Sequence, residues 1–391
     1  LILTSINDPQ NNIYITAVCI TLVAFFSATQ DIIIDAYRIE SVSQKFQGSL
    51  SSMYIAGYRI GMLVGGAGSL WLASYWGSES YDHDVWKKVY LSMSLLMLIG
   101  IIANLISSEP KKLRKFSKKT KLQFGFFLNI LISVLIFIFV YSNINNPFTG
   151  KNILSFLFTL FKLLFCFICS GLFIFLQIKL KFQNRSIIEE SYFNPVKNFI
   201  NKYGKFALLI LLLISLYRIA DVVMGVMANI FYLEKGYSIS DIATYSKFFG
   251  VFATITGGLF GGYFAMRFGT MITLFIGALI ASLSNLLFAW LATTEANLKY
   301  LISVITADNI SSGFAGAAFV IYLSGLTSIK FTATQYALFS SLMLFLPKLI
   351  AGYSGAWVDL MGYQAYFVTT AIIGVPVLFL IIYISKVAPI K

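Results

Sequence analysis

Long runs of apolar residues separated by short polar stretches dominate the chain. An apolar run of about twenty residues is typical of a helix that crosses the hydrocarbon layer of a bilayer. The pattern predicts eleven such spans, at 12–39, 48–73, 86–107, 121–141, 153–179, 205–232, 240–265, 270–292, 298–326, 333–357 and 363–386. Alternating segments typical of a membrane barrel are absent. The predicted fold class is therefore an all-α polytopic membrane protein.

The composition agrees with this prediction. Hydrophobic residues make up 58% of the chain and charged residues only 12%, whereas soluble proteins average about 25% charged. The formal net charge of +13 could indicate nucleic-acid binding. However, the densest basic run, 111–121, lies between two predicted spans, so we interpret it as a loop that faces lipid headgroups and expect no nucleic-acid partner.

The sequence contains few residues that could bind a metal or act as a catalytic nucleophile. The three cysteines, Cys19, Cys166 and Cys169, all lie inside apolar runs, and the CxxC pair has no second pair to complete a metal site. His83 is the single histidine, which leaves no basis for a hydrolytic triad or a histidine-based metal centre. We expect no cofactor, no metal and no enzymatic activity, and a membrane enzyme stays an alternative that turnover without transport would favour.

The distribution of Lys and Arg predicts the orientation. Of the 29 basic residues, 18 lie in one set of loops and 5 in the other. The positive-inside rule therefore predicts a cytoplasmic C-terminus and an external N-terminus. An odd number of spans that begins outside, at Leu1, leads us to expect further helices before this residue.

A short internal similarity suggests two related halves. The stretch 51–59 aligns with 340–348, and one offset of 289 positions matches Ser-Ser, a basic residue and a later Gly-Ala pair. Chance similarity between glycine-rich helices is the alternative. If the repeat is real, the hairpin 121–179 is a peripheral insertion between two six-helix bundles, and the first bundle lacks its first three helices.

This interpretation divides the chain into three parts. Residues 1–110 are the remainder of an N-terminal bundle, with core helices four to six. Residues 111–204 hold basic cytoplasmic loops and the inserted hairpin, and residues 205–391 form a C-terminal six-helix bundle.

Ionisable residues inside predicted spans are the candidate functional groups, because a charge at the bilayer centre costs about 2.5–3.5 kcal/mol or more. Asp31 and Asp35 lie one helical turn apart and share a face, which Arg38 extends. Two like charges need cations from elsewhere, and Arg59 and Lys348 are expected to supply them. A buried carboxylate beside a like charge can bind and release a proton near neutral pH, so the pair is assigned to proton coupling.

Other charged residues have structural alternatives. Arg218 and Asp221 stand three residues apart and can neutralise each other within one helix. Asp308 opens a stretch of small residues, 308–318, which suits close helix contact. Lys162 and Lys247 can extend to the membrane interface.

Two blocks resemble the AmpG family of muropeptide permeases, members of the major facilitator superfamily. They are 27–38 (SATQDIIIDAYR) and 57–65 (GYRIGMLVG). Further similarity lies in LYRIAD at 216–221, ATITGG at 253–258, GAAFV at 316–320 and FTATQYAL at 331–338. A more distant resemblance is to the acetyl-coenzyme A transporter family.

The resemblance implies proton-driven import of anhydro-muropeptides across the bacterial inner membrane for cell-wall recycling, by a protein we expect to be a monomer. The residues expected to bind this sugar and carboxylate substrate are Arg59, Lys348, Arg218, Asp221, Asp308, Gln30 and Tyr58. The alternatives are transport of another organic anion, such as an acyl-coenzyme A or a nucleotide-like solute, and an inactive product of a decayed gene.

Overall fold

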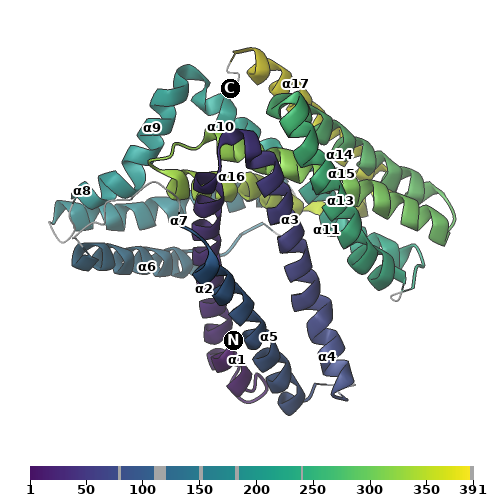
Figure 1. Cartoon of the computed structure of the whole chain (residues 1–391), viewed down its shortest axis with the longest axis horizontal. Coiled ribbons are helices and arrows are strands. Elements are labelled where there is room, and N and C mark those ends of the chain that lie inside the picture. Colours follow the sequence, from purple (N-terminus) through teal and green to yellow (C-terminus); the bar gives the residue numbers. More distant parts are fainter. Residues whose placement is uncertain (78–80, 110–119, 149–152, 181–184, 239–240, 388–391) are drawn as a thin grey trace. The chain divides into compact units, whose positions relative to one another are not determined.

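A computed structural model describes residues 1–77, 81–109, 120–148, 153–180, 185–238 and 241–387. Over these residues the regular structure is entirely helical, which confirms the predicted fold class (Figure 1). All but the last two residues of the basic run at 111–121 lie outside the described residues. The elements in chain order are α1 (Ile2–Ile6), α2 (Ile13–Ser41), η1 (Gln44–Phe46), α3 (Gln47–Leu63), η2 (Val64–Gly68), α4 (Ser69–Tyr75), α5 (His83–Ile106), α6 (Thr120–Asn143), α7 (Ile153–Lys179), α8 (Arg185–Ile188), η3 (Glu189–Phe193), α9 (Asn194–Tyr203), η4 (Gly204–Phe206), α10 (Ala207–Leu216), α11 (Ile219–Glu234), η5 (Ile242–Phe249), α13 (Gly250–Phe268), α14 (Thr270–Thr293), α15 (Leu298–Leu326), α16 (Thr332–Ala351) and α17 (Ser354–Val387).

The chain forms two compact units. Unit 1 consists of Leu1–Lys111, Leu208–Ala351 and Met361–Lys391. Unit 2 consists of Lys112–Ala207 and Gly352–Leu360. Unit 1 contains every residue that the sequence assigns to a site, and unit 2 contains the α6–α7 hairpin. The three-part division at 110 and 204 stays a prediction.

Ten helical stretches of the described residues are long and apolar enough to cross a membrane, one fewer than predicted. The missing one is the span 48–73. There the structure has α3 with 17 residues, the π-helical η2 and α4 with 7 residues. Three of the five η2 residues are glycines, and glycine in a helix interior costs about 1 kcal/mol relative to alanine. The glycines therefore favour a widened turn, through which the helical backbone continues from α3 into α4.

The last two spans also differ from the prediction. Helix α16 ends at Ala351, before the predicted limit of 357, and α17 begins at Ser354. Within α17 the backbone kinks at Gly362, whose φ is +75°. A residue with a side chain rarely adopts this left-handed conformation, so glycine allows the kink.

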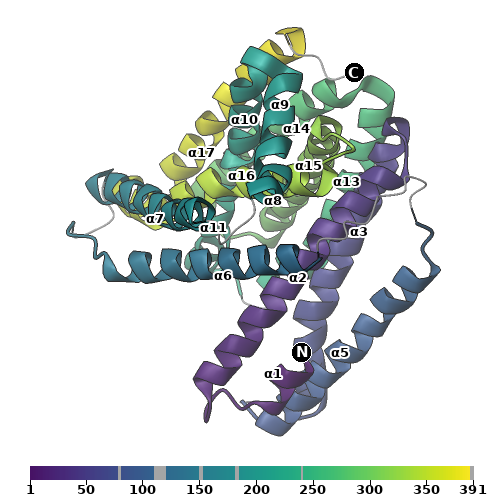
Figure 2. The same cartoon turned by 90° about the vertical axis from the view of Figure 1, so that its left-hand side faces the viewer.

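The core of unit 1 is built on α13, which packs directly against α15 and α3 (Figures 1 and 2). A Cβ added at Gly257 would lie 2.1 Å from the Ile310 carbonyl oxygen, so the α13 and α15 backbones are almost in contact. A Cβ at Gly48 on α3 would lie 2.6 Å from the Gly262 carbonyl oxygen. Lipid supplies no hydrophobic driving force between helices, so such close contact must supply the attraction through dispersion.

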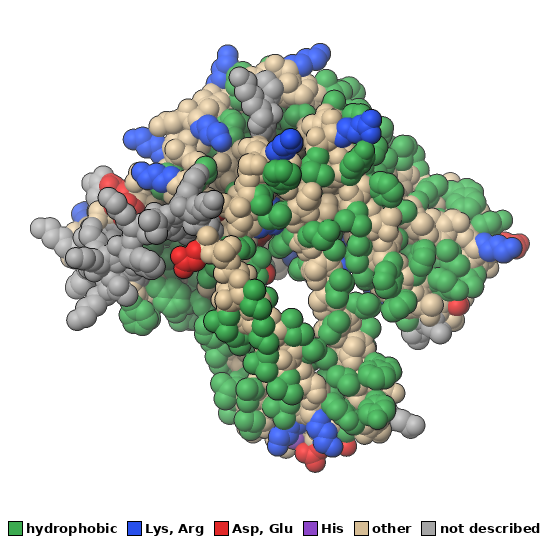
Figure 3. Space-filling model, in the orientation of Figure 1, with side chains coloured by type: hydrophobic (Ala, Val, Ile, Leu, Met, Phe, Trp, Pro, Cys, Tyr) green, Lys and Arg blue, Asp and Glu red, His purple; other side chains and the backbone are tan. Residues whose placement is uncertain are grey.

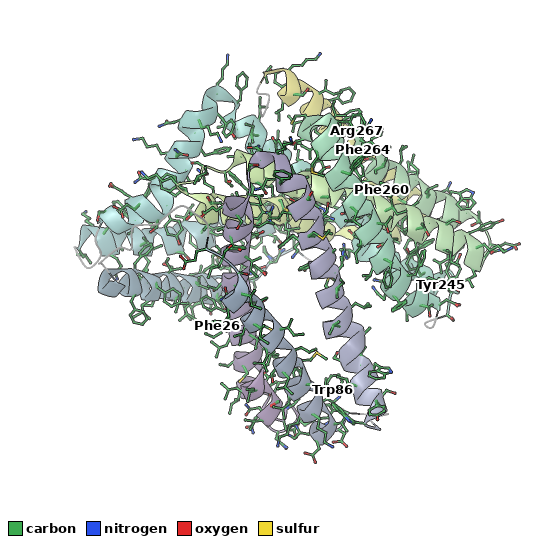
Figure 4. The ribbon with its side chains drawn as sticks, viewed as in Figure 1. Phe26, Trp86, Tyr245, Phe260, Phe264 and Arg267 are labelled. Carbon is green, nitrogen blue, oxygen red and sulfur yellow. The ribbon has the colours of Figure 1, made fainter. Side chains whose placement is uncertain are left out.

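The small-residue face predicted at 308–318 takes part in this contact, which confirms its expected role. A Cβ added at Gly313 would lie 2.1 Å from the Thr254 carbonyl oxygen of α13. Figure 4 follows α13 through the labelled side chains of Phe260, Phe264 and Arg267. The Phe264 ring packs on Phe314 of α15, with centroids 5.5 Å apart. Aromatic packing thus extends the glycine contact along the same pair of helices.

Apolar side chains cover most of the visible surface of helices α2 to α5 (Figure 3). Charged side chains gather at the end where α5 begins. There the Tyr81 hydroxyl donates to Asp8 Oδ1 over 2.9 Å. A hydrogen bond from the Gln10 backbone N–H lowers the pKa of Asp8. The pKa of Tyr81 is raised to about 12, mainly by burial and next by its hydrogen bond to Asp8. This hydrogen bond joins the loop after α1 to the loop before α5.

We expect Gly257→Ala to destabilise the protein by about 1–3 kcal/mol, because the new Cβ would overpack the α13–α15 contact. The matched control is Gly225→Ala in α11, where an added Cβ meets nothing within 4 Å. Thermal unfolding of the two purified variants in detergent would compare them. Equal melting temperatures would show that the close approach does not support the fold.

Candidate functional site

A break between α10 and α11 forms the first candidate site. Helix α10 ends at Leu216 and α11 starts at Ile219, so Tyr217 and Arg218 interrupt a long apolar stretch. The Tyr217 hydroxyl lies 3.2 Å from the Leu274 carbonyl oxygen, and its ring stacks on Phe319 with centroids 4.4 Å apart. Irregular backbone at membrane depth is tolerated where protein buries it. Broken helices commonly form the binding sites of transporters.

The charged side chains at the break meet a polar side chain of α15, and a second polar residue of α15 is hydrogen-bonded to α14. Arg218 forms an ion pair with Asp221, and both side chains are about three-quarters or more buried. Asp221 lies in the first turn of α11, where the helix dipole favours a negative charge. An Arg218 nitrogen lies 3.5 Å from the Ser312 hydroxyl. One turn away on α15, Asp308 accepts a hydrogen bond from Ser284 over 3.3 Å.

Arg59 of α3 lies within electrostatic range of the same group, which we name the Arg218 cluster: Arg218, Asp221, Asp308, Ser284 and Ser312. The Arg59 side chain is half-buried and interacts electrostatically with Arg218, Asp221 and Asp308. Arg59 forms no hydrogen bond or ion pair with the described residues. A half-buried guanidinium without a hydrogen-bonded carboxylate is suited to bind an anion.

A second group surrounds Arg38, whose side chain is only 4% exposed. Its guanidinium lies 3.4 Å from Asp35 Oδ1, 3.2 Å from the Ser51 hydroxyl and 3.0 Å from the Ser324 hydroxyl. The Arg38 guanidinium also forms cation–π contacts with the rings of Tyr54 and Tyr336, whose centroids lie 5.2 and 5.3 Å from its carbon Cζ. We name this group the Arg38 cluster: Arg38, Asp35, Ser51, Ser324, Tyr54 and Tyr336. It joins α2 and α3 to α15 and α16.

The geometry of the Arg38 cluster requires arginine. A planar guanidinium can donate in several fixed directions and stack on aromatic rings at the same time, whereas a lysine ammonium cannot do both equally well. Removing either ionised partner of a buried pair leaves an uncompensated charge. The Arg38 cluster therefore holds four helices together through one side chain.

The structure separates the predicted site residues into two places and leaves others apart. Asp35 lies in the Arg38 cluster, and Arg59 lies beside Arg218, Asp221 and Asp308. The side chains of the remaining four predicted residues are exposed and belong to neither cluster: Gln30, Asp31, Tyr58 and Lys348.

One expectation about ion pairing is wrong. Arg59 and Lys348 were expected to neutralise the aspartates of α2, but Asp35 pairs with Arg38. The reason is local, because Arg38 stands three residues from Asp35 and reaches it without any approach of a second helix. Asp31 still acts electrostatically on Asp35, as two carboxylates one turn apart must.

Arg38 is the functional candidate that the sequence interpretation passed over. Its spacing from Asp35 was the available signal. No local pattern marks Ser324 or Tyr336, which contact Arg38 from about 300 positions away in the chain.

Apolar spanning helices around polar clusters that contain buried ion pairs define a multi-pass membrane protein of the transporter class. The model of the Major Facilitator Superfamily matches residues 1–351. The chain belongs to the major facilitator superfamily. It is therefore a transporter and not an enzyme, as the sequence predicted.

Curated relatives are consistent with the AmpG resemblance. A Rickettsia felis protein named "Putative transporter AmpG 4" is 26% identical over 388 residues, which cover 99% of this chain and 77% of the relative. Its namesake in Rickettsia conorii is 28% identical, with 93% of this chain and 71% of the relative covered. An AmpG 1 protein of Rickettsia conorii is 28% identical, with 97% and 76% covered. The predicted resemblance is thus confirmed.

Replacing Arg38 with Ala is expected to lower the free energy of unfolding by about 3–5 kcal/mol, because Asp35 would be left buried and unpaired. Adding Asp35→Asn to Arg38→Ala should recover part of this loss. Unfolding in mixed detergent micelles measures both effects. The control is Arg267→Ala, an exposed arginine of α13, and a loss as large in the control would contradict a specific role for Arg38.

Proposed function

We propose that this chain imports anhydro-muropeptides with protons across the bacterial inner membrane for cell-wall recycling. The names of the relatives and the AmpG-like blocks support this substrate class. The observation that carries the proposal is the position of Arg59. It lies on α3, within electrostatic range of the Arg218–Asp221 pair and of Asp308 on α15.

Such an arrangement suits an anionic solute. The peptide part of a muropeptide carries carboxylates, and a carboxylate in a poorly hydrated cavity needs a cation within hydrogen-bond reach. Arg59 supplies a guanidinium from one bundle. Arg218 can supply a second from the other when Asp221 or Asp308 is protonated, so the substrate would bind between two positive groups.

Protonation of carboxylates would couple transport to the proton gradient. Asp31 and Asp35 stay the proposed coupling pair. Because Asp35 pairs with Arg38, a proton on Asp35 would weaken the Arg38 cluster that joins α2 and α3 to α15 and α16. Alternating access requires such contacts between bundles to form and break. Protonation would thereby favour the conformation in which these helices separate.

The proposal also covers the orientation in the membrane, the oligomeric state and the role of the hairpin. The excess of Lys and Arg in one set of loops supports a cytoplasmic C-terminus. We propose that the transporter works as a monomer and that the 121–179 hairpin is an insertion between the bundles.

Uptake of labelled anhydro-muropeptide into vesicles that contain the full chain tests the proposal. We expect uptake under an inward proton gradient and its loss with an uncoupler. Asp35→Asn should abolish the gradient-dependent part, because an amide cannot carry the proton. Asp359→Asn changes a carboxylate outside both clusters and serves as the control. Unchanged, uncoupler-sensitive uptake by Asp35→Asn would contradict the coupling assignment.

Arg59→Gln should raise the KM for the muropeptide by about tenfold or more, since a charge-assisted hydrogen bond contributes about 1.5–3 kcal/mol. Initial rates over a range of substrate concentrations give this value. Uptake of coenzyme A or a nucleotide that muropeptide does not inhibit would favour the alternative of another organic anion. Retention of the wild-type KM would remove Arg59 from the substrate site.

A further inference from the structure

The segment between α7 and α10 contains an amphipathic helix outside both clusters. In unit 2, α8, η3 and α9 follow one another without a break. One edge of α9 packs on the protein, through the buried side chains of Pro195 and Phe199. Ile188 and Phe126 form a small core in the same unit. This segment is thus a folded part of unit 2 with a defined inner side.

A second edge of the apolar face is exposed among the described residues of unit 2. Phe193 is 64% exposed, Val196 43% and Ile200 49%. Their spacing of three and four residues places them in one strip along the helix. Beside this strip the exposed side chain of Lys197 begins the polar face, which continues through Asn201. A helix with a lysine border on an exposed apolar strip is typical of the membrane interface.

The chain itself keeps α9 at the bilayer. The stretch Glu189–Glu234 has 46 residues, whereas a helix needs only about 20 to cross the hydrocarbon layer. Only part of it can cross. The break falls at Gly204, whose φ of +53° ends α9. Three residues of η4 then lead into α10, which is apolar apart from Ser215.

The lysines indicate which lipids the strip meets. Residues 194–207 contain Lys197, Lys202 and Lys205 and no acidic residue. All three lysine side chains are exposed. A cluster of lysines beside a spanning helix attracts anionic headgroups through their phosphate charge.

We propose that α9 is an interfacial helix that binds anionic phospholipids of the adjoining leaflet. Phe193, Val196 and Ile200 insert below the headgroups, and Lys197, Lys202 and Lys205 contact the lipid phosphates. This role is independent of the transported solute, because it rests only on unit 2 and the chain that follows it.

The depth of α9 can be measured with spin labels on the full chain in nanodiscs that contain phosphatidylglycerol. Ile200→Cys and Asn201→Cys form a matched pair of adjacent positions on the two faces. A nitroxide at 200 should collide with oxygen and be protected from a water-soluble nickel complex, and a nitroxide at 201 should show the reverse. The unsubstituted chain, labelled in parallel, gives the background of the native cysteines. Equal nickel accessibility at both positions, or a label at 200 shielded from both reagents, would overturn the proposal, the latter because protein would cover the strip.

Binding of fluorescent phosphatidylglycerol tests the lysines. The triple variant Lys197→Gln, Lys202→Gln and Lys205→Gln should bind this lipid more weakly than the unsubstituted chain, by about fivefold for each lysine removed. The two proteins should bind phosphatidylcholine equally. The control triple, Lys45→Gln, Lys330→Gln and Lys386→Gln, removes the same charge elsewhere. An equal loss in both triples, or none in the first, would overturn specific binding at α9.

Discussion

A charged side chain at membrane depth needs a partner, and this constraint determines how the described helices meet. Arg38 and Arg218 each pair with an aspartate three residues away on their own segment. Pairing within one segment offsets part of this cost before the helices assemble. Each guanidinium also reaches a serine of α15, Ser324 for Arg38 and Ser312 for Arg218. Helix α15 therefore contributes residues to both clusters, and these contacts explain its polar positions.

Close backbone packing makes these contacts possible. Glycines of α13 allow α15 and α3 to approach until their backbones nearly touch. Since α3 and α15 both lie on α13, Ser51 and Ser324 come within reach of one arginine. Bulkier residues at these glycines would separate the helices and leave polar groups without partners. Small residues and buried charges are thus parts of one arrangement, in which van der Waals contact sets the distances and ion pairs set the register.

The two clusters suit different tasks. In the Arg38 cluster a carboxylate, two hydroxyls and two aromatic rings surround one guanidinium, whose buried Nε has no hydrogen-bond partner among the described residues. Arg59 beside the Arg218 cluster lacks such partners. A guanidinium with this many partners favours a fixed contact between helices, whereas a cation without a hydrogen-bond partner leaves room for a solute. Membership of the major facilitator superfamily gives both features a context, because a transporter needs contacts that hold one conformation and a site that binds.

The sequence alone determined the fold class, nearly all spans, the AmpG resemblance and the importance of charged residues in spans. These properties depend on local composition, and a bilayer makes local hydrophobicity decisive. Tertiary structure decided the partners: Arg38 instead of Arg59 for Asp35, and Ser324 and Tyr336 for Arg38. It also decided that η2 widens one turn of the helix at 47–75 and that Gly362 kinks α17. Such outcomes depend on which helix faces approach each other across hundreds of positions, and no periodicity in a single segment carries that information.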